Sequence, residues 1–175
     1  MFKQLTAIAL GTAAVFSPLE AVARSNHNHH VALVRAALRT GIEIKINPKQ
    51  CDREGALGWY YARGNELVVC QQNKIKGSTV ERPWTEEDYD TLRHEVHHLV
   101  QDCMIRGRRD GTLGAVYQDP ITVAKQILGT DNMRQIAHVY RDRDNHTILM
   151  EFEAFSVARM NDPLEQVNDV QTYCL

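Results

Sequence analysis

The sequence predicts an α+β domain in which a small, mainly antiparallel sheet comes first and a mostly helical half follows. Two observations predict this order. Between residues 42 and 70, short runs of alternating or aromatic residues are separated by turn residues, which is typical of strands. After residue 85, apolar residues recur instead at helical spacing. The length of 175 residues suits a single domain.

The individual elements can be placed along the chain. An apolar helical pattern over residues 31–39 stops at Gly41. The His-rich segment before it, residues 26–30, is interpreted as a solvated tail, with a second metal site as the alternative. Strands are expected over residues 42–46, 58–62 and 66–70, and helices over residues 86–105, 121–128, 132–140, 147–160 and 164–173.

Residues 1–23 have the layout of a secretory signal peptide. Lys3 gives a positive start, residues 5–16 are an apolar run, and Ala21-Val22-Ala23 offers the small residues that signal peptidase requires. The run is shorter than the roughly 20 apolar residues of a spanning helix, although an uncleaved membrane anchor stays an alternative. We therefore expect a secreted or periplasmic protein, free of the membrane after signal cleavage, with one domain over residues 24–175.

The charge and the cysteine content narrow the class of protein. The formal net charge is -2, so charge gives no reason to expect binding to nucleic acid or to a membrane surface. The four cysteines predict two disulfides in an oxidising compartment, with reduced core thiols as the alternative. Of the three possible pairings we favour Cys51–Cys70, across the strand region, and Cys103–Cys174, which would pin the C-terminal tail to the central helix.

The helix expected from Glu86 to Ile105 carries the most informative motif, because His94, Glu95 and His98 read H-E-x-x-H. Thr85 is a suitable N-cap, and acidic residues follow it in the first turn. Residues four apart lie one turn apart on the same helix face, so the two imidazoles can hold one zinc ion. The glutamate between them then points at a water on the metal and can take its proton. We expect one Zn²⁺ per chain.

A third ligand decides whether these histidines face solvent or a cleft, because both fall opposite the apolar side of their helix. Glu151 shares an apolar stripe with its neighbours in the helix expected over residues 147–160. A buried carboxylate is costly unless it meets a cation or a metal. Glu153 falls on the other side of that helix and could reach solvent. Glu151 is therefore the expected ligand, with a salt bridge to a nearby arginine as the alternative.

Other polar residues are expected either to orient the metal ligands or to donate a hydrogen bond to the substrate. His97 is expected behind the ligands or exposed, and Asp102 could orient a ligand or cap a turn. Hydrolysis of a peptide also needs a donor for the developing oxyanion. The possible donors are Tyr117, His138, Tyr140 and His146, of which we prefer His138 and Tyr140 because they precede the Glu151 helix.

The segments HEVHH and EFEAFSVA resemble the gluzincin clan of zinc peptidases, in which HExxH supplies two ligands and a glutamate on a later helix supplies the third. The E-F-x-A core is most similar to the membrane-associated CAAX-processing and heat-shock metallopeptidases, and this likeness also maps the third ligand to Glu151. Those enzymes carry an aspartate where this chain has Phe155. The resemblance implies a zincin-like domain whose upper strand binds the substrate backbone, and residues 66–70 are nominated for that strand.

The predicted function is therefore hydrolysis of peptide bonds in a peptide or protein substrate, by a zinc-activated water with Glu95 as general base. Two other classes of protein stay open. One is a non-catalytic exported module that uses zinc for folding or for binding a partner. The other is a disulfide-stapled binding domain without a metal.

Overall fold

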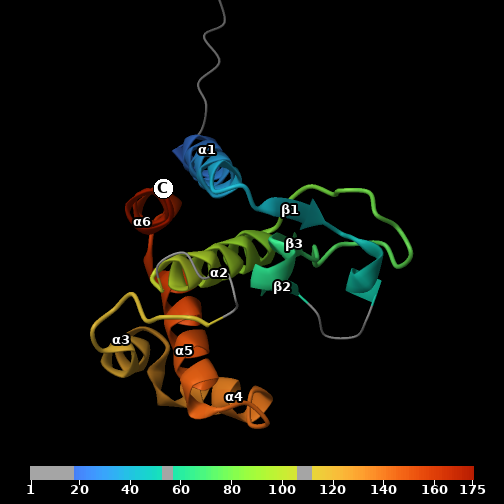
Figure 1. Ribbon diagram of the computed structural model, residues 1–175. Helices are drawn as coiled ribbons and strands as arrows, with labels where there is room; N and C mark the ends of the chain where they lie inside the picture. Colours follow the sequence, from blue (N-terminus) through green and yellow to red (C-terminus); the bar gives the residue numbers. More distant parts are fainter. Residues whose placement is uncertain (1–17, 53–56, 106–111) are drawn as a thin grey trace, which may run out of the picture.

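The computed structural model describes residues 18–52, 57–105 and 112–175. It confirms the α+β class: a three-stranded sheet lies near the N-terminus and a helical half follows, as Figure 1 shows. A long helix, α1 (Pro18–Arg39), precedes the sheet. The expected signal peptide lies mainly outside the described residues and stays a prediction. Within the described part of the chain, no helix is both long and apolar enough to cross a membrane.

The sheet is mixed, so the expectation of a mainly antiparallel sheet is wrong for one of its two pairings. Its strands are β1 (Glu43–Ile46), β2 (Gly58–Tyr61) and β3 (Glu66–Val69), in the order β1-β3-β2. β2 and β3 pair antiparallel across the short helical turn η2 (Ala62–Gly64), whereas β1 pairs parallel to β3. Local sequence patterns do not encode which strand lies in the middle, and here β3 does.

This strand order corrects the nominated substrate strand. Residues 66–70 contain β3, which is hydrogen-bonded to a strand on both sides and has no free edge. Leu67, Val68 and Val69 of β3 are fully buried. β2 is the edge strand that lies next to the central helix α2 (Glu86–Cys103).

The helices that begin at Glu86, Pro120, Asn145 and Pro163 start close to where the sequence predicts because each has a local start signal. The helix expected over residues 31–39 instead begins at Pro18, and the one expected over residues 132–140 begins at Gly129, without a side-chain cap. Thr85 and Asp88 form a capping box at the start of α2. Asp119, Asp144 and Asp162 each accept a hydrogen bond from a backbone N–H of the helix that follows. The helices of the second half are α3 (Pro120–Ile127), α4 (Gly129–Val139), α5 (Asn145–Met160) and α6 (Pro163–Cys174).

α2 runs through the middle of the molecule, with the sheet on one side and α5 and α6 on the other (Figure 1). Its apolar residues Leu92, Val96 and Leu99 lie in the main core, packed with residues of α1 and β3. The structure contains the disulfides Cys51–Cys70 and Cys103–Cys174, which is the pairing favoured from the sequence. The second disulfide joins the end of α2 to the end of α6.

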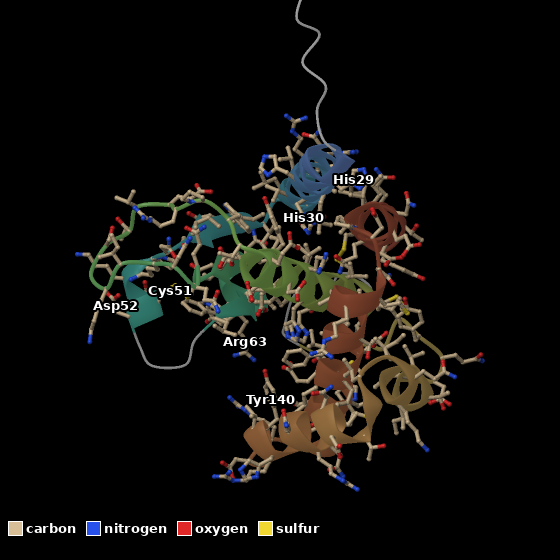
Figure 2. All side chains as sticks on the ribbon, turned by 180° about the vertical axis from the view of Figure 1, so that it is seen from behind. His29, His30, Cys51, Asp52, Arg63 and Tyr140 are labelled. Carbon is tan, nitrogen blue, oxygen red and sulfur yellow. A yellow bond between two sulfur atoms is a disulfide. The ribbon has the colours of Figure 1, made fainter. Side chains whose placement is uncertain are left out.

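The His-rich segment is not a solvated tail, because residues 26–30 belong to α1 and pack against other helices. His29 Nδ1 lies 3.2 Å from a carboxylate oxygen of Asp162. His30 is 2% exposed and stacks on Tyr89 with 4.1 Å between ring centroids. Figure 2 shows both histidines on α1. Burial lowers the pKa of His30 to about 4, and the nearby Arg93 guanidinium also opposes its protonation.

His30 should make the free energy of unfolding depend on pH. The unfolded chain takes up a proton on this residue near pH 6.5, while the folded protein does so only near pH 4. The unfolded state therefore binds more protons within that window, and stability falls as the pH drops through it. Denaturant unfolding at pH 7 and pH 5 should show that His30→Phe removes about 1–2 kcal/mol of the decline.

His138→Gln serves as the control, because His138 is exposed and its removal should leave the decline unchanged. If His30→Phe loses stability with falling pH as steeply as the parent, burial of His30 is not a source of the pH dependence.

Candidate metal centre

Three side chains from α2 and α5 meet in one buried cluster. His94 Nε2 lies 3.2 Å from Glu151 Oε2, and His98 Nε2 lies 3.5 Å from Glu151 Oε1. The two Nε2 atoms are 3.0 Å apart. His94, His98 and Glu151 are 8%, 6% and 9% exposed, so the histidines do not lie on a solvated face. Among the residues that the structure describes, this is the only group of three or more potential metal ligands brought together.

α5 packs against α2, and the small residues Ala154 and Ala158 of α5 are buried. Phe155, which stands where the similar metallopeptidases carry an aspartate, packs its ring 4.3 Å from the His94 ring. His94 Nδ1 is buried without a hydrogen-bond partner among the described residues. Packing by Phe155 and the contacts of Nε2 with Glu151 and His98 therefore orient His94.

The donor set fits a zinc ion. Ligand atoms about 2.0–2.1 Å from a tetrahedral zinc lie roughly 3.3 Å from one another. One ligand atom each from His94, His98 and Glu151 lie within 4.8 Å of one another, which is compatible with this spacing. Glu151 Oε2 is buried and has no hydrogen-bond partner in the described part of the chain. Burial of a carboxylate oxygen is costly, and a cation at this position would offset the cost together with the His94 imidazole 3.2 Å away.

The electrostatics of the cluster favour a positive charge. Burial opposes a charge on His98, but the adjoining Glu151 carboxylate outweighs burial and raises the pKa of His98 to about 9. Burial would likewise raise the pKa of Glu151, but the two imidazoles outweigh it and lower that pKa far below its usual range. Both shifts mean that the site stabilises a cation between these side chains, which is the charge that a bound zinc ion supplies.

Glu95 lies beside the cluster and is held by the edge strand. Burial raises its pKa, and the nearby His94 and His98 oppose that rise. The backbone N–H of Tyr60 in β2 donates a hydrogen bond to the Glu95 carboxylate. A Cβ on Gly58 would come within 2.6 Å of Thr91 Cγ2 and 3.1 Å of Glu95 Oε1, so only glycine lets β2 pass this close to α2.

The cluster opens into a cleft of about 680 Å³. His94, Glu95, His98 and Glu151 contribute to the lining of this cleft. The surrounding lining comes from β2, Ala62 and Arg63, and from Leu113, Tyr140 and Arg143. Figure 2 shows Arg63 at the end of the sheet and Tyr140 on the helical half facing it. A structural zinc site is usually closed by four protein ligands, whereas this one has three and faces a cleft.

Gln101 fixes the orientation of His98, and sequence reasoning missed it. The Gln101 Nε2 group donates to Met150 O and to Glu153 Oε2, both at 3.1 Å. Its Oε1 atom therefore faces His98 Nδ1, at 2.8 Å, and that nitrogen must carry the hydrogen. In the neutral form that can bind a metal, the lone pair of His98 is then on Nε2, which points toward Glu151. The only sequence feature that could have indicated this hydrogen bond is the spacing of three residues between His98 and Gln101, which makes them neighbours on the helix surface.

Glu153 does not reach solvent, which corrects the expectation. It is fully buried, and its Oε1 accepts hydrogen bonds from the backbone N–H groups of Val116 and Tyr117, at 2.8 and 2.7 Å. A segment from outside the helix therefore covers this side of α5. His97 is also fully buried, with Nε2 3.7 Å from Glu153 Oε1, too far for a hydrogen bond. Burial lowers the pKa of His97, so this imidazole is neutral.

Of the four possible oxyanion donors, the structure brings Tyr140 into the cleft. Burial raises the pKa of Tyr140, and the negative charge of Glu151 adds to this, so the hydroxyl keeps its proton. His138 is exposed, and its Nε2 atom lies 3.3 Å from Arg141 Nη1. It is not among the residues that line the cleft. His146 Nε2 contacts Leu113 O at 2.7 Å, and the Tyr117 hydroxyl accepts from Asn161.

Asp102 contacts the edge strand and not the ligands. The Tyr60 hydroxyl donates to Asp102 Oδ2 at 2.6 Å, one turn of α2 beyond His98. Tyr60 therefore ties β2 to α2 twice, through its backbone at Glu95 and through its side chain at Asp102. These contacts hold the strand over the helix that carries the motif.

Comparison of the chain with protein-family models, with curated proteins and with solved structures finds no match. The likeness to the gluzincin clan therefore rests on the residues of α2 and α5 themselves. The finding that stands without it is a buried His94, His98 and Glu151 group able to bind a metal ion.

Replacing Gln101 with leucine should weaken zinc binding by about 10–100-fold, because His98 then loses the partner that fixes its hydrogen on Nδ1. A competition titration against a chromophoric chelator measures the affinity. The matched control is Gln166→Leu, since Gln166 is equally buried and donates to Arg93 O without contacting a ligand. Equal zinc affinities of the two folded variants would show that Gln101 does not orient His98.

Proposed function

We propose that this protein is an exported zinc-dependent metallopeptidase. The observation that carries the proposal is that two imidazoles and one carboxylate meet at an open cleft, with the Glu95 carboxylate beside them. His94, His98 and Glu151 would hold the ion. When bound, zinc lowers the pKa of a water molecule and polarises a carbonyl oxygen. The resemblance of α2 and α5 to gluzincin peptidases adds support from the residue pattern.

Glu95 has the properties that a general base requires in this reaction. It is buried beside the ligands without belonging to the ligand group, and its raised pKa makes it a better proton acceptor than an exposed carboxylate. The Tyr60 backbone amide holds it in place. Glu95 would take a proton from the attacking water and return it to the leaving amine.

The edge strand β2 would bind the substrate backbone. It lies along the cleft next to Glu95 and ends at Tyr61, whose neighbours Ala62 and Arg63 also line the cleft. A peptide can extend a sheet at such an edge by backbone hydrogen bonds, with side chains alternating toward and away from the cleft. This role falls to β2 because β3 is internal to the sheet.

Export is supported by two kinds of observation. The disulfides Cys51–Cys70 and Cys103–Cys174 form and persist in oxidising compartments such as the periplasm or the extracellular space. The layout of residues 1–23 is that of a signal peptide. We propose that the domain over residues 24–175 acts there on unfolded or extended protein segments.

The Glu95→Gln variant tests the proposal. It should bind one zinc per chain like the parent, because Glu95 is not in the ligand group. Its cleavage of a denatured protein substrate should fall by about 10²–10⁴-fold, since it cannot take the proton. Zinc content is measured by atomic emission and cleavage by release of labelled peptides.

Glu87→Gln, an exposed position on the same helix, is the control and should keep full activity. Undiminished cleavage by Glu95→Gln would refute the mechanism. A zinc-loaded parent that cleaves none of a broad set of peptides would instead indicate a non-catalytic zinc module.

Tyr140→Phe tests the oxyanion donor. Loss of the hydroxyl should lower kcat by about 10–10³-fold with little change in KM, because the hydrogen bond forms only as charge develops on the carbonyl oxygen. Steady-state kinetics at saturating zinc gives both constants. If Tyr140→Phe has the kcat of the parent at saturating zinc and loses activity only at limiting zinc, Tyr140 positions Glu151 and does not contact the oxyanion.

A further inference from the structure

The walls of the cleft carry two arginines from opposite halves of the fold. Arg63 lies in η2, directly after the edge strand, and Arg143 lies in the turn between α4 and α5. Both side chains line the cleft and both residues are exposed. A substrate extended along β2 would therefore pass between a guanidinium group on each side. Figure 2 shows the Arg63 side of this opening facing Tyr140.

Among the described residues that line the cleft, the negative groups lie at the metal centre. The carboxylates among the lining residues are Glu95 and Glu151, the proposed base and the third ligand. Asp142 and Asp144 flank Arg143 in sequence, but neither lines the cleft. Asp144 is committed to the start of α5, where its side chain accepts from Thr147 N at 2.8 Å. Away from the metal centre, the charged side chains among the described lining residues are those of Arg63 and Arg143, although the whole chain has a formal net charge of -2.

We propose, on the basis of the proposed function, that the cleft selects peptides with a carboxylate within a few residues of the bond to be cut. The guanidinium group of arginine matches a carboxylate with two parallel N–H donors, which gives both affinity and orientation. The carboxylate belongs either to an aspartate or glutamate side chain or to the C-terminus of the peptide. Arg63 holds it on the sheet side of the cleft, or Arg143 on the helical side.

Binding to the zinc-loaded full chain with Glu95→Gln tests this selection separately from cleavage. The probes are two fluorescent pools of random hexapeptides, identical except that asparagine and glutamine replace aspartate and glutamate in the second pool. Each pool is made with a free and with an amidated C-terminus. Fluorescence anisotropy should show that the acidic or free-acid peptides bind at least about tenfold more tightly than neutral ones, as expected for a charged hydrogen bond.

Adding Arg63→Gln and Arg143→Gln together should reduce this preference to less than about twofold, because the partners of the carboxylate are gone. Arg159→Gln, an exposed arginine at the far end of α5, is the matched control and should leave the preference intact. A preference that is lost when the C-terminus is amidated assigns the terminal carboxylate, and one that is lost when aspartate and glutamate are replaced assigns a side chain.

Equal binding of acidic and neutral peptides, or a preference that survives the double substitution, overturns the inference. A failure of this inference can be distinguished from a failure of the proposed peptidase activity. Cleavage of peptides by the parent without any acidic preference overturns the inference alone. A preference in binding without cleavage by the parent supports the inference and overturns the peptidase activity.

Discussion

The meeting of Glu151 with the imidazoles of His94 and His98 is the constraint on which the positions of the other elements depend. Polar side chains buried between two helices cost free energy unless their charges and hydrogen bonds offset one another. The offset requires α5 to pack against α2, as it does in this fold. The sheet and α6 pack against the remaining sides of α2 and keep it inside the protein.

The orientation of the site is set by hydrogen bonds that are complete before any ligand arrives. The side-chain amide of Gln101 has one orientation, because its Nε2 group donates to Met150 O and to Glu153 Oε2. Glu153 is in turn fixed by the backbone of Val116 and Tyr117. On the opposite side, the backbone of Tyr60 holds Glu95. Donors and acceptors aimed in advance lose little free energy to reorganisation when a charge forms near them.

The sequence predicted the parts of this protein that depend on neighbours along one helix. The starts of α2, α3, α5 and α6 followed from local caps, and Glu151 was preferred over Glu153 because it lies in an apolar stripe. The parts that depend on distant segments could not be read in this way. Glu153 is buried because residues 116 and 117 cover it, and His30 because it stacks on Tyr89. The central place of β3 likewise follows from how the strands pair across the chain.

The disulfide between Cys103 and Cys174 closes a long loop that contains α3, α4 and α5, over a sequence separation of 71. In the synthesis of the chain, the two histidines emerge well before Glu151, and Cys174 emerges later still. A nascent chain that has emerged only this far therefore presents two of the three potential metal ligands. The order of synthesis therefore delays the enclosure of a metal ion until α5 has folded onto α2. Oxidation of Cys103 and Cys174 to a disulfide then links the end of α2 covalently to the end of α6.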